Sequence, residues 1–180
     1  MTDQLEYLEH DSGSRRWLGI AASVVAALAL ATLAAVGWAD HTASSTTDDL
    51  AVAYTDAVNE AHAAEGRVQV ALAYVAPAVW RDDLPPEKRD ELWLVVSQQA
   101  DGAADELSDL LTRVQETTVL PWRQDQSAAR QALTELISDQ ENRFRSMAQD
   151  IRRVDLYLAS GPVPTGAAEQ ALRAVGAPIR

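Results

Sequence analysis

The longest apolar stretch of the chain runs from Trp17 to Ala39 and contains no ionisable side chain. About 23 residues of helix are enough to cross a hydrocarbon core of ~30 Å. Arg15 and Arg16 precede this stretch, Asp40 follows it, and a tryptophan stands at each border, where indole rings favour the headgroup region. The pattern therefore predicts a transmembrane helix over residues 17–39.

The charges on the two sides of this span predict its orientation. Arginines immediately before a span hold that side in the cytoplasm, whereas the other side opens with acidic residues at Asp40, Asp48 and Asp49. We therefore expect a single-pass protein of the plasma membrane with its N-terminus inside. The expected parts are a disordered cytoplasmic tail (1–16), the span (17–39), a juxtamembrane linker (40–47) and an extracytoplasmic helical domain (48–180).

A cleaved export signal is the alternative interpretation of the same segment. The run from Ser14 to Leu18 resembles a twin-arginine start, and residues 37–39 offer small side chains to a peptidase. An apolar run of about 20 residues is longer than the usual signal core, which favours an uncleaved anchor. An exported soluble helical protein stays open as the rival.

Small residues recur every four positions within the span. They would form one face on which two helix backbones can approach closely, either with a second copy or with another membrane protein. The alanine-rich composition of the segment is a competing explanation for the same pattern. The face consists of Gly19, Ser23, Ala27, Ala31 and Ala35.

Beyond residue 47, apolar residues follow heptad spacing, which predicts three helices packed together. The first helix carries them from Leu50 to Val75 and fades near Pro77, the second starts at Pro85-Pro86, and the third runs from about Asp125 to Ala159. Antiparallel neighbours then match large residues with small ones at equal distances from each turn. We expect an all-α fold, with the transmembrane helix followed by an antiparallel up-down-up three-helix bundle.

A short fourth helix is predicted after the breaker at residues 161–164. Thr165 is suited to cap its start, and Gly166 to Val175 carry a small apolar face. In an up-down-up bundle this C-terminal helix is expected at the end far from the membrane.

Two glutamines interrupt the apolar series of the second and third predicted helices at nearly the same height. Gln99 and Gln140 would each be costly alone in an apolar layer, but a pair of side-chain amides can bond to one another and fix the register. A polar ligand site is the alternative. We therefore expect a buried polar pair.

The turn between the second and third helices is expected to lie at the bilayer. Trp122 is suited to the headgroup layer, and Arg113, Arg123 and Arg130 would face anionic lipid. The alternative is that Trp122 covers the end of the core. The sequence therefore predicts a membrane-surface contact at this turn.

Composition limits the chemistry. The chain has no cysteine and a net charge of −12, which argues against nucleic acid as a partner. Nucleophile elbows, phosphate loops and zinc-helix motifs are missing from the sequence, so no enzymatic activity and no cofactor are expected. His62 and Glu65 are spaced for metal binding, but two ligands do not complete a site, so no metal is expected.

These patterns favour a non-enzymatic adaptor or scaffold in a membrane or envelope complex, working through an extracytoplasmic protein partner. The outline is similar to bacterial extracytoplasmic sensor domains, a resemblance of architecture alone. A small-ligand or stress-sensing domain, with its site near Gln99, Gln140 and His62, is therefore the second hypothesis. The frequent alanine and the replacement of lysine by arginine are typical of a high-GC bacterial genome.

Overall fold

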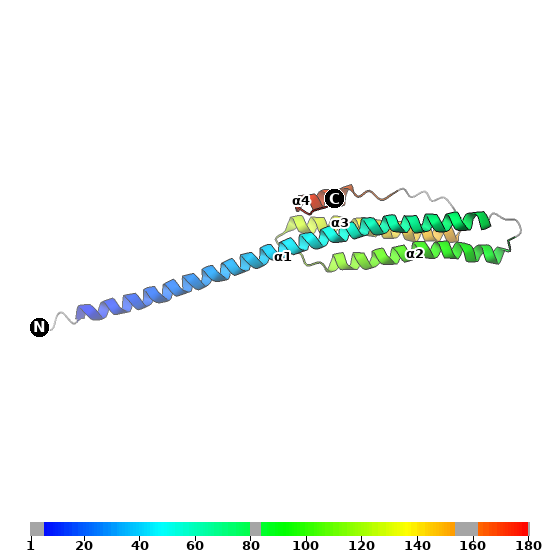
Figure 1. The fold of residues 1–180 in the computed structure, drawn as a ribbon. Coiled ribbons are helices and arrows are strands. Elements are labelled where there is room, and N and C mark those ends of the chain that lie inside the picture. The colour runs from blue at the N-terminus through cyan, green and yellow to red at the C-terminus, as the bar shows by residue number, and fades with distance from the viewer. Residues whose placement is uncertain (1–5, 80–83, 154–161, 180) are drawn as a thin grey trace. The chain divides into compact units, whose positions relative to one another are not determined.

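The computed structural model describes residues 6–79, 84–153 and 162–179, with side chains from Ala27 onward. All the secondary structure in these ranges is helical, which confirms the all-α class. The helices are α1 (Glu6–Val79), α2 (Pro86–Glu116), α3 (Gln124–Arg152) and α4 (Gly166–Ala174) (Figure 1). The chain comprises two compact units, Met1–Ala43 and Ser44–Arg180, and α1 contributes residues to both.

Helix α1 passes through the segment that was expected to be a juxtamembrane linker. Residues 40–47 are helical, and Ala43, Thr46 and Thr47 are buried, so the predicted linker is wrong. The segment contains no proline or glycine, and the Thr42 hydroxyl bonds back to the Trp38 carbonyl at 2.8 Å. Propagating an existing helix costs far less than nucleating a new one.

The same argument applies to the N-terminal tail. Helix α1 begins at Glu6, so the part of the expected disordered tail that the structure describes is helical. Residues 1–5 lie outside the described part. A helix that already exists over the apolar segment extends at low cost into the residues before it.

The core of the second unit consists of the predicted heptad positions. Seven of the eight apolar positions predicted on α1 between Leu50 and Val75 are buried, and Ala71 is half-buried. Helix α2 contributes an alanine-rich stripe and α3 contributes larger side chains, so small residues face large ones. The fully buried large side chains include Leu50, Leu107, Leu133, Ile137, Phe144 and Ile151.

Polar contacts fix how the three long helices pair within this unit. The Thr46 hydroxyl donates to the Thr118 carbonyl at 2.9 Å, which joins the start of this unit to the turn after α2. The Gln126 amide donates to the Thr47 hydroxyl at 2.9 Å, and Arg143 of α3 pairs with Glu65 of α1. Helices α1 and α3 therefore run parallel and α2 runs antiparallel to both, in the predicted up-down-up order.

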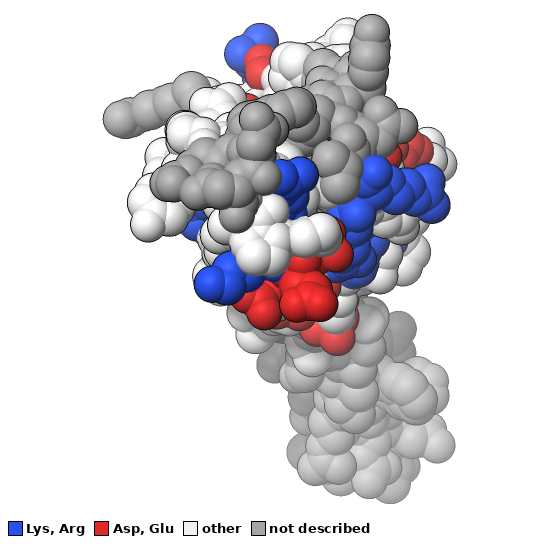
Figure 2. All heavy atoms as spheres, turned by 90° about the vertical axis from the view of Figure 1, so that its right-hand side faces the viewer, with Lys and Arg blue, Asp and Glu red and all other residues white. Residues whose placement is uncertain are grey.

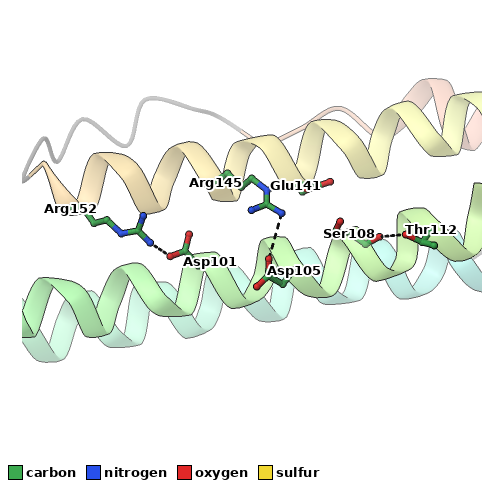
Figure 3. A network of polar contacts seen from close by, with 7 residues as sticks. All are labelled: Asp101, Asp105, Ser108, Thr112, Glu141, Arg145 and Arg152. Carbon is green, nitrogen blue, oxygen red and sulfur yellow. Dashed lines mark hydrogen bonds and ion pairs between the residues drawn. The ribbon is translucent and has the colours of Figure 1, made fainter.

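Ion pairs bridge α2 and α3 along their outer edge (Figure 3). Arg152 pairs with Asp101, and Arg145 reaches Asp105 at 3.5 Å while also bonding Glu141 of its own helix at 2.9 Å. These arginines belong to α3 and the aspartates belong to α2. They link the two helices outside the apolar core.

The fourth helix has the predicted bounds to within one residue but not the predicted place. Tyr54 donates a 2.9 Å hydrogen bond to Glu169, so α4 packs beside the start of α1 in this unit and not at its far end. Ala168 and Leu172 are its buried residues. About 13 residues separate the end of α3 from α4, which is enough chain to return along the bundle at 3.3–3.6 Å per residue.

Within the part of the chain that the structure describes, no helix is both long enough and apolar enough to cross a membrane. Gly19 and Ser23 of the predicted packing face lie outside the residues with described side chains. Ala27, Ala31 and Ala35 of the same face are exposed.

Candidate functional site

The predicted glutamine pair is not formed. Gln140 is buried, but Gln99 is exposed on the outer side of α2. The buried series of α2 passes through Val96, Ala100 and Ala103, which turns position 99 away from the core. Among the described residues, the buried Oε1 atom of Gln140 has no hydrogen-bond partner.

A different buried polar contact was missed. Gln126 is fully buried and donates to the Thr47 hydroxyl, so it ties the start of α3 to α1. A sequence signal for it existed, because Gln126, Leu133 and Gln140 are spaced by seven and share one heptad position. That spacing should have placed Gln126 in the core.

The residues proposed for a small-ligand site do not converge. His62 is exposed on α1, as Gln99 is on α2, whereas Gln140 is buried. Glu65 is engaged by Arg143 of α3. Among the described residues, no group of three or more histidine, aspartate or glutamate side chains is placed to hold a metal ion.

The turn between α2 and α3 exposes its tryptophan. Trp122 is 64% exposed, and Leu120 is the residue of this turn that closes the core. This exposure does not fit the alternative in which Trp122 covers the core. Of the three arginines predicted beside it, Arg123 pairs with Asp125 at 3.3 Å and Arg130 donates to the Thr117 carbonyl at 3.0 Å. Arg113 lines a groove between α1 and α2.

The groove that Arg113 lines lies between α1 and α2. Two hollows of about 270 and 460 Å³ share Asp56, Leu110 and Arg113, so they form one continuous groove. Its remaining lining consists of Asp49, Val52, Ala53, Val114 and Thr117 in the first hollow and Asn59, Glu60, Ala63, Glu106 and Asp109 in the second. We call this feature the α1–α2 groove. It combines an apolar floor with a mostly acidic rim.

Two carboxylates of the acidic rim, Glu60 and Glu106, shift each other's pKa. The hydrogen bond with Glu60, helped by partial burial, raises the pKa of Glu106. Burial raises the pKa of Glu60, but its bonds to Glu106 and to Arg67 outweigh that effect and leave this pKa lowered. Arg67 contacts both carboxylates, at 3.0 Å for Glu106. Independently of these shifts, the groove lining carries five carboxylates against one arginine, Arg113, and this excess of negative charge favours a positively charged ligand.

A third hollow, of about 560 Å³, lies near the start of α2. It is lined by Glu87, Asp90, Glu91, Trp93, Leu94 and Arg152. The view onto this end of the bundle shows acidic and basic side chains adjoining one another (Figure 2).

The contact that holds α4 includes a carboxylate whose pKa is lowered in the folded state. Bonds from the Thr165 hydroxyl, at 2.8 Å, and from Tyr54 lower the pKa of Glu169. A lowered pKa in the folded state stabilises the contact above the ordinary glutamate pKa of about 4.3, and this stabilisation is lost as the pH falls through the folded value. We expect amide hydrogen exchange in α4 to accelerate in that acidic range, ahead of exchange in α3.

The matched variants for this prediction are Tyr54→Phe and Glu169→Gln. The first removes one of the bonds that lower the pKa, so the loss of protection should begin at higher pH. The second removes the titrating group, so α4 exchange should lose this pH dependence. Unchanged pH dependence in the Glu169→Gln variant would assign the effect to another carboxylate.

Comparison of the chain with protein-family models, with curated proteins and with solved structures gave no match. The features of the described residues that bear on function are the groove, the exposed apolar part of α1 and the exposed turn.

Proposed function

We propose that this chain is a non-enzymatic, membrane-anchored protein that presents a helical bundle outside the cytoplasmic membrane for contact with partner proteins. The observation that carries the proposal is the exposure of large apolar side chains on α1. Within 27–38, which is helical, these side chains are 61–69% exposed, namely Leu28, Leu30, Leu33, Val36 and Trp38. At 3.6 residues per turn they point to every side of the helix.

A helix that is apolar on all sides is stable where its surroundings are apolar. Neither water nor the described residues of the first unit provide such surroundings, whereas lipid does. The uncharged sequence from Trp17 to Ala39 extends this apolar surface to the length of a span. The arginines before it and the aspartates after it favour an extracytoplasmic bundle.

The turn at Trp122 supports the same arrangement by chain connectivity. Thr46 bonds to Thr118 beside this turn, so the turn lies at the end of the second unit from which the chain leads back to the span. An exposed tryptophan at that end is suited to the headgroup layer. Arg123 stands next to it and could add about 1 kcal/mol of attraction to anionic lipid.

The small-residue face of the span supports association within the membrane. Ala27, Ala31 and Ala35 share one exposed face of α1, on which another transmembrane helix can approach closely. The sensing hypothesis is less well supported, because His62, Gln99 and Gln140 do not meet in one pocket.

Membrane fractionation tests the anchor. We expect the full chain to stay in the membrane pellet after an alkaline wash, because a span of about 20 apolar residues inserts effectively irreversibly. Protease added to intact spheroplasts should digest the bundle and leave residues before the span protected. A mature chain that starts near Asp40 and is found in the soluble fraction would instead establish the cleaved signal.

A double substitution provides the control for this experiment. Leu28→Arg with Leu33→Arg places two charges in the middle of the span, each costing about 2.5–3.5 kcal/mol for insertion. This variant should shift to the soluble or aggregated fraction. The same pair of arginines at the exposed bundle residues Gln98 and Gln115 should leave the protein in the membrane.

A further inference from the structure

Helix α1 carries a second heptad series, displaced by two residues from its core series. Its spacing is 4, 3, 4, 3, 4, 3, 4, and every member is exposed. The displacement of two residues turns these positions by about 200° from the core series, onto the outer side of α1. The series consists of Val52, Asp56, Asn59, Ala63, Gly66, Val70, Ala73 and Pro77.

Helix α2 has a matching exposed series with spacing 4, 3, 4, 3, 4. It consists of Val95, Gln99, Gly102, Glu106, Asp109 and Arg113. Residues of both series line the α1–α2 groove, so the two series border the same face of the bundle. A helix lying in this groove would contact both edges.

The three faces between the long helices differ in what the described residues place on them. Helix α4 covers the face between α1 and α3, through Leu172 and through the bond from Tyr54 to Glu169. The ion pairs of Arg145 and Arg152 bridge α2 and α3 (Figure 3). The α1–α2 face is bridged by one ion pair, from Arg67 to Glu106 at 3.0 Å, and among the described residues no further helix lies over it.

The chemistry of this face changes along its length. The part nearer the start of the second unit has an acidic rim, built from Asp49, Asp56, Glu60, Glu106 and Asp109. Farther along, the two edges carry no charge and expose apolar side chains, with Val70 72% exposed and Val95 49%. Tyr74, beside the α1 edge, is 82% exposed.

We propose that the α1–α2 groove binds an amphipathic helix of a different protein. That helix carries lysine or arginine where it faces the acidic rim, and apolar residues where it extends past the groove toward the exposed Val70 and Val95. This inference rests on the proposed function and identifies its partner class. Burial of the exposed apolar edges provides affinity, and the acidic rim provides charge complementarity and fixes direction.

A second copy of this chain fits the face less well. Two copies anchored in one membrane would stand parallel and bring their acidic rims together. Like charges brought together in this way disfavour the complex, and each copy carries a net charge of −12. A basic partner removes this repulsion.

Two glycines permit a docked helix to approach closely. A Cβ atom added at Gly66 or at Gly102 would meet nothing within 4 Å, so larger residues fit there in the free protein. Glycine lowers helix stability relative to other residues, so replacement should preserve or strengthen the fold. A bulky side chain at these positions would nevertheless obstruct a helix in the groove.

Site-specific photo-crosslinking of the full chain in its native cells tests the proposal. A photoreactive phenylalanine analogue is placed at Val52 or Ala63, which line the α1–α2 groove, or at the control position Leu94, which lines a different hollow. We expect adducts from the two groove positions and at least tenfold less from Leu94. Mass spectrometry should map each adduct to a helical segment with basic residues three or four apart.

Three sets of variants separate binding from folding. Gly66→Leu and Gly102→Leu should each reduce the yield of adduct at least tenfold. Their thermal unfolding temperature should be unchanged or higher. Ala128→Leu, at an exposed position of α3, is the control and should leave the adduct yield unchanged. Glu106→Lys with Asp109→Lys should reduce it similarly. Asp139 is exposed on α3, so Asp139→Lys is the charge control and should leave the adduct yield unchanged.

The other outcomes overturn the proposal in distinguishable ways. Adducts between two copies of this chain would identify the groove as a homodimer interface. Adducts with an acidic or uncharged segment, or with lipid, would reject the partner class. Adducts from Leu94 alone would keep the proposed function but reject the groove, and the absence of adducts from all three positions would reject both the groove and the partner-contact function.

Discussion

The Phe144→Ala variant is expected to lose about 3–5 kcal/mol of its free energy of unfolding. Phe144 is fully buried and is the largest of the fully buried side chains. Helix α2 contributes three alanines to the same core, Ala100, Ala103 and Ala104, whose methyl groups cannot extend into a vacated space. The cavity should therefore persist, and its cost adds to the lost transfer free energy.

Urea unfolding of the full chain in mild detergent, followed by circular dichroism, measures this effect. Trp122→Ala is the matched control, because Trp122 is an aromatic residue of similar size that is largely exposed. Its free energy of unfolding should change by about 0.5 kcal/mol or less in the absence of lipid vesicles. Similar losses in the two variants would mean that Trp122 also packs in the core.

The heptad spacing of apolar residues was enough to predict the three long helices and their order. Leu50, Val68 and Val96 are buried as that spacing predicts. A polar residue at such a position would be costly to bury, whichever helix packs against it. The linker was mispredicted for the opposite reason. Polar composition at 40–47 indicates solvent contact or a small apolar face, and only packing reveals that Thr46 and Thr47 face other helices.

The candidate site was harder to predict than the core. The series from Val52 to Pro77 contains Asp56 and Asn59, so its polarity predicts an exposed face, but polarity does not tell whether another helix lies over that face. The location of α4 decides this question, and it depends on a long connection whose path no local pattern specifies. The polarity of the groove residues could therefore be predicted from the sequence, but the absence of a described helix over them could not.

Gln99 illustrates a narrower limit. It is one position away from Ala100, and a shift of one residue turns a side chain by about 100° around the helix. The apolar stripe of α2 is so wide that the sequence pattern allows either Gln99 or Ala100 to face the core. In the structure Ala100 and Ala103 are buried and Gln99 is exposed. The prediction that paired Gln99 with Gln140 was wrong because it used height along the bundle without this rotation.

The two buried glutamines of α3 should consequently respond in opposite directions to the same substitution. Gln126→Leu removes the hydrogen bond that joins α3 to Thr47 of α1, and we expect a loss of about 1–3 kcal/mol. Gln140→Leu removes a buried acceptor that has no hydrogen-bond partner among the described residues, and we expect no loss or a gain of about 1 kcal/mol. Both substitutions place a side chain of similar size in the same heptad position.

The pair is its own control, because helix propensity and apolar transfer are alike for the two sites. The residues are 14 positions apart, about 21 Å along the helix, so the effects in the double variant should be additive within about 0.5 kcal/mol. Urea unfolding under identical conditions measures all three variants. If Gln140→Leu costs as much as Gln126→Leu, the Gln140 side chain must have a polar partner, and a cavity or bound molecule beside it would then have to be sought in the α3 core.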